Sequence, residues 1–124
     1  MIEYLAKFDS NDLVAKVQAV IIQQLSTGRP SQASIAKALN MSLRNLQRKL
    51  KQEGTTFRQL VDDIRRQLAT QFIQENSRSI GEISYNLGFS EPANFTRAFK
   101  SWTGISPKQY RQAIKQGNIP LKNF

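Results

Sequence analysis

Apolar residues recur at three- and four-residue steps along most of the chain, which is the spacing of one face of an α-helix. The first run covers residues 13–25 and stops at the Gly-Arg-Pro sequence of residues 28–30, which interrupts helices. Shorter runs predict helices over residues 32–39 and 43–53. Because no stretch shows the two-residue alternation of a half-buried strand, the sequence predicts an all-α fold.

Capping boxes, in which Ser or Thr precedes Glu or Gln by three residues, predict three further helix starts. The boxes are Thr56–Gln59, Ser79–Glu82 and Ser106–Gln109. The first opens a long helix over residues 57–76, the second opens a short helix ended by Gly88, and the third has Pro107 at its first helical position. The predicted apolar stripe of the long helix is Phe57, Leu60, Val61, Ile64, Leu68 and Phe72.

The second half of the chain repeats the first. IAKALNMS (residues 35–42) aligns with ISYNLGFS (83–90), and NLQRKLK (45–51) aligns with NFTRAFK (94–100). The alignment pairs Asn40 with Gly88, two residue types that tolerate a left-handed turn. Each copy reads as a helix-turn-helix, whose second helix enters the major groove of DNA. The predicted fold has seven helices in two helix-turn-helix subdomains joined by a long central helix.

This organisation predicts five segments along the chain. They are a tail or linker remnant (1–10), a first helix-turn-helix subdomain (11–55), a connecting helix (56–77), a second helix-turn-helix subdomain (78–116) and a C-terminal tail (117–124). A connecting helix of about 20 residues spans about 30 Å, close to the roughly 34 Å between successive major-groove segments on one face of DNA. The same helix is equally suited to be the central core element.

Eighteen Lys and Arg against nine Asp and Glu give a formal charge of +9, which favours a polyanionic partner. The chain has no Cys and no His, so thiolate nucleophiles, zinc–thiolate sites and the usual proton shuttle are excluded. We therefore expect no enzyme activity, cofactor or metal. No apolar run approaches the roughly 18 residues of a membrane span, and the N-terminus does not read as a signal peptide. A cytoplasmic protein without a membrane partner is expected.

The segment IGEISYNLGFSEPANFTRAFKSWTGISPKQYR, residues 80–111, resembles the signature region of the AraC/XylS transcription regulators. It carries Ile-x-x-Ile, a Gly-Phe turn, Phe-x-Arg-x-Phe-Lys and Ser-Pro-x-x-Tyr-Arg, and NMSLRNLQRKLKQEG (40–54) is similar to the family's first recognition helix. The resemblance covers about residues 11–115. It implies binding to one face of DNA, contact with RNA polymerase by an activator, and a sensor or dimerisation domain that members carry before this unit.

The helix over residues 43–53 is the first predicted recognition helix, with Ser42 as its cap. Its predicted inward stripe is Leu43, Leu46 and Leu50. Arg suits bidentate contact with guanine, and Gln or Asn suits adenine. The candidates for base contact are therefore Arg44, Gln47 and Arg48, which also match the reading positions that the resemblance implies, with Asn45 a lesser candidate.

The second recognition helix is expected to be capped by Ser90. Helical spacing assigns its aromatic residues Phe89, Phe95, Phe99 and Trp102 to the core. The remaining candidates for base contact are Ala93, Asn94, Thr96 and Arg97, beside an exposed Pro92. Arg97 is the strongest candidate among them, whereas Pro92 and Ala93 can offer only shape and apolar contact, for example to thymine methyl groups. We therefore predict that the first unit carries more of the hydrogen-bonded readout.

Phosphate contact needs charge more than geometry and suits a second set of residues. The set is Lys37, Ser42, Lys49, Lys51, Ser90 and Lys100. For any one of these lysines, a merely solvated position is an equal alternative. Arg65 and Arg66 follow Asp62 and Asp63 at helical spacing, so intrahelical ion pairs are the expected role of these two arginines.

The sequence thus predicts sequence-specific binding to double-stranded DNA by a bacterial-type transcription regulator, with the two recognition helices in adjacent major grooves. A non-specific nucleoid or RNA-binding protein is the first alternative. A protein-interaction module, such as an adaptor for RNA polymerase, is the second. Raising the salt concentration distinguishes a sequence-specific reader from the first alternative. A protein that binds through charge alone loses its affinity for all nucleic acids together as salt rises, whereas a specific reader keeps its preference for one duplex.

Overall fold

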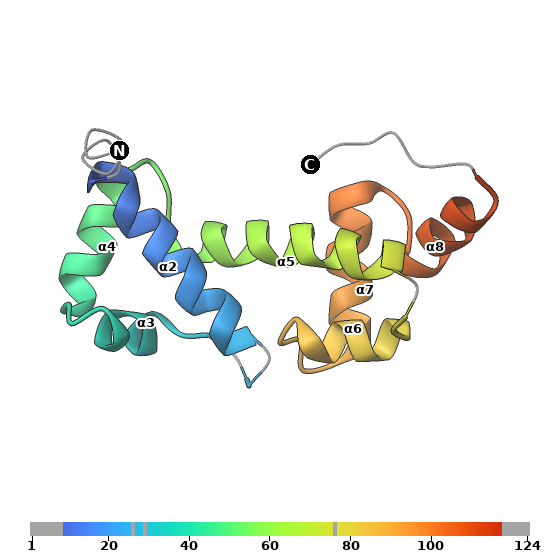
Figure 1. The fold of residues 1–124 in the computed structure, drawn as a ribbon, viewed down its shortest axis with the longest axis horizontal. Helices are drawn as coiled ribbons and strands as arrows, with labels where there is room; N and C mark the ends of the chain where they lie inside the picture. Colours follow the sequence, from blue (N-terminus) through green and yellow to red (C-terminus); the bar gives the residue numbers. More distant parts are fainter. Residues whose placement is uncertain (1–8, 26, 29, 76, 118–124) are drawn as a thin grey trace. The chain divides into compact units, whose positions relative to one another are not determined.

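The computed structural model describes residues 9–25, 27, 28, 30–75 and 77–117, which form seven α-helices and no strand (Figure 1). In chain order the helices are α2 (Asp9–Leu25), α3 (Gln32–Ala38), α4 (Leu43–Gln52), α5 (Phe57–Glu75), α6 (Ile80–Asn86), α7 (Pro92–Thr103) and α8 (Pro107–Lys115). The all-α prediction is confirmed. The predicted tail is too long, because α2 already begins at Asp9. Residues 1–8 and 118–124 of the predicted tails lie outside the described residues.

The chain divides into two compact units, Met1–Ile64 and Arg65–Phe124. The division falls inside α5, so this helix contributes Phe57–Ile64 to unit 1 and Arg65–Glu75 to unit 2. Unit 1 also contains α2, α3 and α4, and unit 2 also contains α6, α7 and α8 (Figure 1). Each unit therefore holds one copy of the sequence repeat together with part of α5.

Unit 1 buries one apolar side of each of its helices. Its buried apolar residues are Val17, Ile21 and Leu25 of α2, Ile35 and Ala36 of α3, Leu46 and Leu50 of α4, and Leu60, Val61 and Ile64 of α5. The Ser34 hydroxyl donates to Gln24 Oε1 at 2.7 Å and ties α3 to α2. The expected inward position of Leu43 is wrong, since this side chain is 42% exposed. Leu43 is the first residue of α4, so its side chain lies at the end of the helix, whereas Leu46 and Leu50 further along are buried.

Unit 2 is built around aromatic residues. Its buried cluster is Ala69, Ile73, Ile83, Leu87, Phe95, Phe99 and Tyr110, with Phe89 and Trp102 among the partly buried residues packed against it. The Phe99 ring lies 5.3 Å from Tyr110 and 5.8 Å from Phe95, measured between centroids, in edge-on arrangements that aromatic pairs favour. The assignment of the α7 aromatic residues to the core is confirmed.

The predicted stripe of α5 is only partly correct. Leu60, Val61 and Ile64 are buried as expected, and Leu68 and Phe72 are partly buried against the unit 2 cluster. Ala69 and Ile73, however, are fully buried and were not part of the predicted stripe. The prediction of one continuous stripe assumed that the whole helix packs against a single core. The two parts of α5 belong to different units, and Ala69 and Ile73 pack into the cluster of unit 2.

Helix starts follow the capping predictions closely. Reciprocal capping boxes form at Ser79–Glu82 and Ser106–Gln109, as predicted, and also at Ser31–Ser34, which was not predicted. At the start of α5 the Gln59 N–H donates to Thr56 Oγ1 at 3.1 Å, while the Gln59 side-chain amide donates to Asp63 at 3.1 Å. This box is therefore half formed, because the Gln59 side chain bonds along its own helix instead of to the cap.

The Ser79 box also carries a titratable group. The Ser79 backbone N–H donates to the Glu82 carboxylate at 2.9 Å and is the main reason that the pKa of Glu82 lies below its usual value. The Ser79 hydroxyl and the positive charge of Arg78 lower this pKa further. The box thus stabilises the ionised form of Glu82 in the folded protein.

Candidate nucleic-acid interface

The two helix-turn-helix units share the same turn geometry. Asn40 has a φ of 57° and Gly88 a φ of 83°, so both aligned positions adopt the left-handed conformation that the sequence predicts. The turn is closed by the Met41 N–H bond to the Ala36 carbonyl at 2.8 Å in unit 1 and by the Phe89 N–H bond to the Ser84 carbonyl at 3.1 Å in unit 2. These four residues are aligned in the repeat, so the internal repeat is a repeat of backbone geometry as well as of sequence.

The second helices of the two units begin differently. In α4, Ser42 is the N-cap, and its hydroxyl accepts the Asn45 N–H at 3.1 Å, as predicted. The predicted cap of α7 by Ser90 is wrong, because the N-cap is Glu91, without a side-chain capping bond. Pro92 at the first helical position holds the residue before it in an extended conformation, so Glu91 takes the cap position with φ −142° and ψ 143°. Ser90 is left one residue outside the helix.

The exposed side of α4 carries more of the predicted contact residues than the exposed side of α7 does. Leu46 and Leu50 are buried, which turns Arg44, Arg48 and Lys51 outward at three- and four-residue spacing. Gln47 and Lys49 are exposed as well, whereas Asn45 is half-buried. Leu43, exposed at the start of α4, is an apolar contact candidate that the sequence pattern placed in the core.

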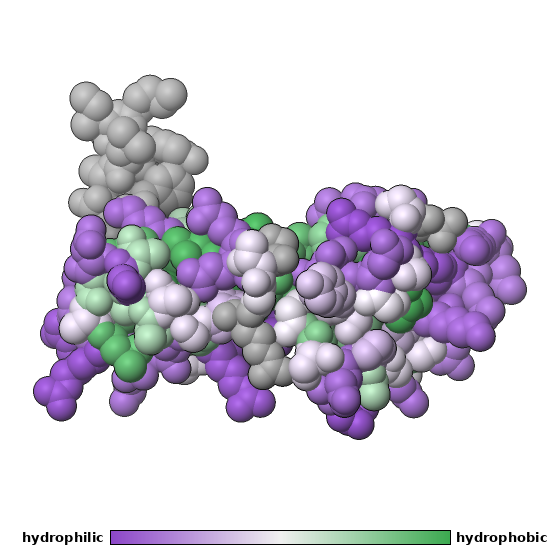
Figure 2. All heavy atoms as spheres, turned by 90° about the horizontal axis from the view of Figure 1, so that it is seen from below, coloured by the Kyte–Doolittle hydropathy of each residue, from purple (hydrophilic) through white to green (hydrophobic). Residues whose placement is uncertain are grey.

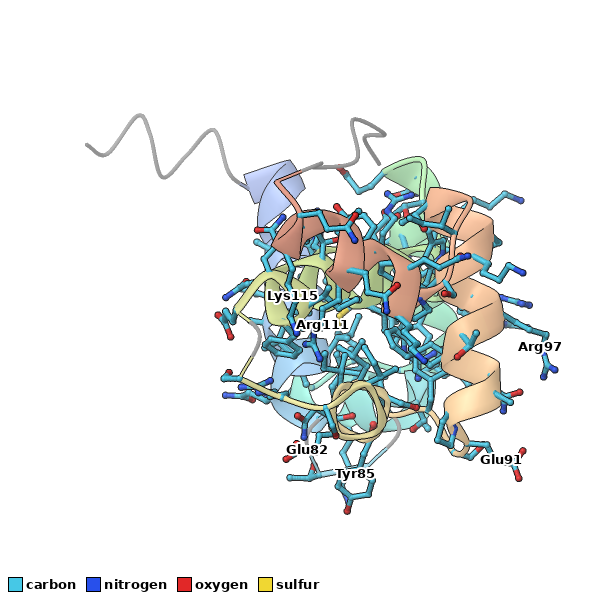
Figure 3. The ribbon with its side chains drawn as sticks, turned by 90° about the vertical axis from the view of Figure 1, so that its right-hand side faces the viewer. Glu82, Tyr85, Glu91, Arg97, Arg111 and Lys115 are labelled. Carbon is cyan, nitrogen blue, oxygen red and sulfur yellow. The ribbon has the colours of Figure 1, made fainter. Side chains whose placement is uncertain are left out.

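The exposed side of α7 is smaller and carries fewer polar groups. Ala93, Arg97 and Lys100 are exposed, and Figure 3 shows Arg97 extending away from the packed side of α7. Asn94 and Thr96, predicted to be exposed, are only half-exposed, because Phe95 beside them is fully buried. Arg97 is therefore the longest solvent-exposed side chain of α7 that can form hydrogen bonds.

The same hydrogen bond joins aligned residues in α4 and α7. The Arg48 guanidinium donates to Asn45 Oδ1, and the Arg97 guanidinium donates to Asn94 Oδ1. Each pair is three residues apart on its helix, a spacing that makes side chains neighbours. In unit 2 the Asn94 amide also donates to the Ser90 hydroxyl at 3.4 Å. The sequence placed all four residues at the interface but predicted no bond between them.

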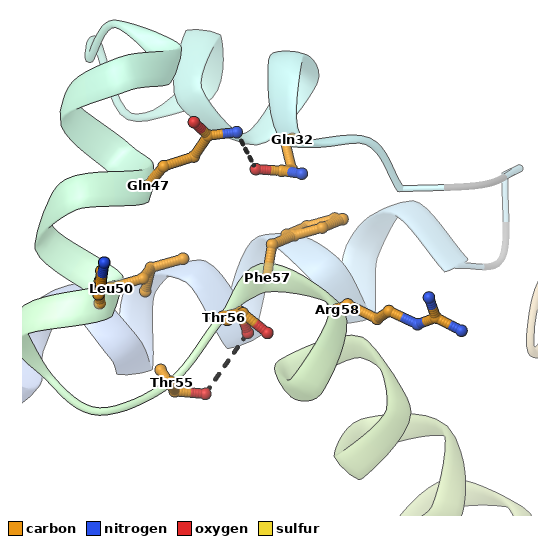
Figure 4. A pocket seen from close by; sticks show the side chains of 8 residues that line it. Gln32, Gln47, Leu50, Thr55, Thr56, Phe57 and Arg58 are labelled. Carbon is orange, nitrogen blue, oxygen red and sulfur yellow. Dashed lines mark hydrogen bonds between the residues drawn. The ribbon is translucent and has the colours of Figure 1, made fainter.

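Gln47 lies at the edge of a pocket in unit 1 (Figure 4). Its side-chain amide donates to Gln32 Oε1 at 2.8 Å, which links α4 to the start of α3. Leu50 and Phe57 provide apolar walls, and Lys51 and Arg58 line the same pocket. The Gln47 amide is thus already held by a neighbouring helix, a partner that the sequence did not reveal.

Phosphate-contact candidates lie on three helices and in the residues just before α4 and α7. Lys37 on α3, Lys49 and Lys51 on α4, and Lys100 on α7 are all exposed, as are Ser42 and Ser90. Figure 2 shows one face of the protein, on which hydrophilic side chains surround small hydrophobic patches. The four lysines are thus exposed to solvent, where a polyanion can reach them.

Arg65 has a role that the sequence did not predict. Its guanidinium donates to the Leu87 carbonyl at 2.8 Å and to the Gly88 carbonyl at 3.3 Å, and it lies 4.4 Å from the centroid of the Phe89 ring. These residues end α6 and form the turn before α7. A cation at the carbonyl end of a helix is favourable, so Arg65 fastens this turn to α5. Arg111 similarly faces inward, with Nε donating to the Ile73 carbonyl at 3.4 Å.

Comparison with known proteins agrees with this geometry. The family model described as "Helix-turn-helix domain" matches residues 35–113, a range that starts inside α3 and ends inside α8. The chain belongs to the AraC/XylS family. It carries the helix-turn-helix DNA-binding domain of a transcription regulator. The AraC-type assignment covers both units, so each copy of the repeat is part of the family's domain.

Two AraC-type relatives are 36% and 42% identical to this chain over the residues that align. The ornithine utilization regulator of Pseudomonas aeruginosa is 42% identical over 84 residues, covering 68% of this chain and 25% of the relative. The urease operon transcriptional activator of Escherichia coli is 36% identical over 86 residues, covering 69% of this chain and 29% of the relative. The chain thus aligns with little more than a quarter of the length of these curated relatives.

Solved AraC-type structures have the same fold. A DNA-binding transcriptional dual regulator from Escherichia coli K-12 gives a TM-score of 0.78 at 29% identity, covering 84% of this chain and 93% of that one. An AraC-type regulator from Chromobacterium violaceum gives a TM-score of 0.74 at 26% identity, covering 86% and 96%. Over the ranges that the structure describes, no helix is both long and apolar enough to cross a membrane, and no group of acidic side chains is suited to a metal ion.

Proposed function

We propose that the protein reads duplex DNA with α4 and α7, each placed in its own segment of major groove. The observation that carries this proposal is the equivalence of Arg48 and Arg97. The two arginines align in the repeat, are exposed on their helices and are held by the same hydrogen bond to an asparagine. Arginine is the side chain that most commonly specifies a base, through bidentate contact with guanine.

The remaining contacts divide by chemistry. Arg44 and Gln47 of α4 are suited to hydrogen bonds with base edges, while Ala93 and Thr96 of α7 offer apolar contact with thymine methyl groups. The exposed residues Lys37, Ser42, Lys49, Lys51, Ser90 and Lys100 are assigned to phosphates. Because α7 exposes fewer hydrogen-bonding groups than α4, unit 1 carries the larger share of base discrimination.

Two reading units in one chain favour a bipartite binding site. If each recognition helix occupies a neighbouring segment of major groove, the two half-sites lie about 10 bp apart, centre to centre. Both half-sites are read by one molecule. A single chain therefore suffices for binding, and no two-fold symmetry is required of the DNA sequence.

We infer that this domain works within a longer regulator. The aligned region covers only 25% of the ornithine utilization regulator and 29% of the urease operon activator, so these relatives have room for further domains. A sensor or dimerisation domain joined to this one supplies the response to a signal, and activation involves contact with RNA polymerase. We propose further that the protein acts in the cytoplasm and has no catalytic activity of its own.

Selection of bound sequences from a random duplex pool tests the proposal. The expected result is one enriched bipartite motif, with stronger base preference in one half than in the other. Binding to this motif should exceed binding to random duplex and to RNA by about 10³-fold or more at physiological salt. If no motif is enriched, and the affinities for duplex DNA and RNA fall in parallel as salt rises, the result supports a non-specific basic protein instead.

Two substitutions separate DNA binding from a protein-interaction role. Arg48→Ala and Arg97→Ala together remove the strongest base-contacting group of each helix while leaving the buried residues of both helices unchanged. Binding to the selected duplex should fall steeply, with the helical content preserved by circular dichroism. Unchanged duplex affinity in the double variant would favour an adaptor that contacts another protein.

A further inference from the structure

The asparagines of α4 and α7 occupy the same place on the helix in spite of the different helix starts. Asn45 is the third helical residue after the cap Ser42, and Asn94 is the third after the cap Glu91. Their backbones are fixed, since the Asn45 N–H bonds to Ser42 Oγ at 3.1 Å and the Asn94 N–H bonds to the Glu91 carbonyl at 3.0 Å. Each side chain therefore starts from a fixed point on the first turn.

From that fixed point, each asparagine oxygen accepts a hydrogen bond from an exposed arginine one turn further on. Hydrogen bonds from a charged group are stronger than those between neutral groups. An exposed arginine has many rotamers, and immobilising such a side chain on binding costs conformational entropy. A guanidinium that is already held in place when DNA arrives loses less of this freedom.

We propose that Asn45 and Asn94 are positioning residues that hold Arg48 and Arg97 for base contact, and are not themselves readers of base edges. This inference rests on the proposed function, because it presupposes that the two arginines meet DNA. It replaces the direct base contacts that the sequence assigns to the two asparagines.

The geometry favours positioning over reading. Bidentate recognition of adenine uses both the oxygen and the amide nitrogen of asparagine. In each unit the oxygen instead bonds an arginine on the same helix. In unit 2 the amide nitrogen is also engaged, with the Ser90 hydroxyl at 3.4 Å. Both asparagines are half-buried, whereas both arginines are exposed.

The two units differ in how firmly the asparagine is held. Because α7 begins after Glu91, Ser90 lies outside the helix and accepts a bond from the Asn94 side chain. In α4 the corresponding serine is the cap, and its hydroxyl accepts the Asn45 backbone N–H. Arg97 is therefore connected to its helix start by two successive side-chain hydrogen bonds, through Asn94 to Ser90, whereas Arg48 has the bond to Asn45.

A double-mutant cycle on the selected duplex tests the inference. The readout is the preference for the base specified by Arg48, measured as the ratio of affinities for the selected duplex and a duplex changed at that base pair. Arg48→Ala should lower this ratio by about 5- to 150-fold, and Asn45→Ala by about 2- to 10-fold. In the Arg48→Ala background, Asn45→Ala should change it by less than about twofold, because residues that act through one contact are not additive.

Fully additive losses in this cycle overturn the inference, since they show that Asn45 contacts the DNA on its own. Gln47→Ala is the matched control, because Gln47 bonds Gln32 and has no bond to Arg48, so its effect should add to that of Arg48→Ala. The same cycle with Asn94 and Arg97 tests unit 2. If the wild-type domain shows no base preference at all, the proposed function fails, and this outcome is distinct from an additive cycle.

The conservative variant Asn45→Asp provides a second readout. Aspartate keeps the acceptor for Arg48 but lacks the amide donor that adenine recognition needs. Its negative charge should weaken binding to all duplexes together, while the preference ratio at the Arg48 base pair stays within about twofold of the wild-type value if the residue positions Arg48. A preference ratio as low as that of Asn45→Ala would contradict the inference. Circular dichroism and thermal unfolding check that each variant is folded.

Discussion

The guanidinium of Arg65 lies 4.4 Å from the centroid of the Phe89 ring, and the same group donates to the carbonyls of Leu87 and Gly88. One side chain of α5 therefore holds the end of α6, the left-handed residue of the turn and the aromatic residue that follows it. The turn that sets the direction of α7 depends on a residue 22 positions earlier in the chain.

Arg65→Ala should lower the free energy of unfolding by about 1–3 kcal/mol, because it leaves two carbonyls without a charged donor and removes a cation from an aromatic ring. Urea denaturation followed by fluorescence measures this effect. Arg65→Lys should recover only part of the loss, because an ammonium group lacks the planar fork of arginine. Arg58→Ala is the matched control at an exposed arginine and should change stability by less than about 0.5 kcal/mol. A similar small effect at Arg65 would contradict the bracing role.

Phe99→Ala should cost about 3–5 kcal/mol, the range for removing a buried aromatic side chain. The Phe99 ring is fully buried and lies 6.3 Å from Trp102, the single tryptophan of the chain. Trp102 fluorescence therefore reports on unit 2. The fluorescence transition of the variant should move to lower denaturant, while part of the helical circular dichroism signal, from unit 1, remains. Loss of the whole signal in one step would show that the two units unfold together.

Acid should weaken the Ser79–Glu82 cap. The pKa of Glu82 is lowered in the folded protein, so its contribution to stability is fully present above the pKa of Glu82 in the unfolded chain and is lost as pH falls through the folded value. Glu82→Gln keeps an acceptor for the Ser79 N–H but does not titrate. Stability of the wild type should therefore drop more steeply than that of Glu82→Gln as pH falls below about 5. Parallel pH profiles would show that Glu82 has the same pKa in the folded and unfolded states.

The Ser106–Gln109 box is the internal comparison for this pH effect. The Ser106 N–H donates to Gln109 Oε1 at 3.0 Å, nearly the same geometry as at Ser79, but the acceptor is uncharged. Ser106→Ala should therefore cost about 0.5–2 kcal/mol of stability, the range for loss of a cap, with no dependence on pH between about 3 and 6.

Base preference should depend more on α4 than on the first turn of α7. Alanine at Gln47 or Arg48 should relax preference at particular base pairs by about 1–3 kcal/mol each. Alanine at Asn94 should have a smaller effect, because it removes only a partner of Arg97. Binding to a panel of single-base-pair variants of the selected duplex measures this. Equal losses from all three substitutions would contradict the unequal division between the units.

Lys49→Ala should weaken binding by a similar factor for all duplexes, because a phosphate contact carries no base information. The slope of log affinity against log salt should fall by about one unit. Arg48→Ala, in contrast, should alter the ranking of duplexes. An unchanged salt slope in Lys49→Ala would show that Lys49 is merely solvated.

Much of the fold is predictable from sequence because helix starts and ends are decided locally. The roles of four residues can be predicted from their immediate neighbours alone. They are the caps Ser79 and Ser106, each with a partner three residues later, and Asn40 and Gly88 in the turns. The prediction for Ser90 was wrong because the neighbouring Pro92 restricts the backbone before it. Residue type alone therefore favoured the wrong cap.

The remaining features depend on contacts between distant residues. Arg65 was expected to pair along its own helix, and only the fold brings the carbonyl of Leu87 within 2.8 Å. Gln47 meets Gln32 across a separation of 15 residues. The asparagine–arginine pairs are local, yet sequence spacing gives the neighbours of a side chain and does not reveal which of them it bonds.

The division of the chain within α5 has a practical consequence for anyone who wishes to study one unit alone. A fragment cut between Ile64 and Arg65 would leave each unit its own buried residues of α5, Leu60 and Val61 in the first fragment and Ala69 and Ile73 in the second. It would also leave each fragment with a bare helix end where the chain is now continuous. Fragments that overlap, so that both retain residues 57–75, keep the helix whole in each. Fragments that duplicate α5 are therefore the ones that preserve both the buried residues of each unit and the continuity of the helix that the two units share.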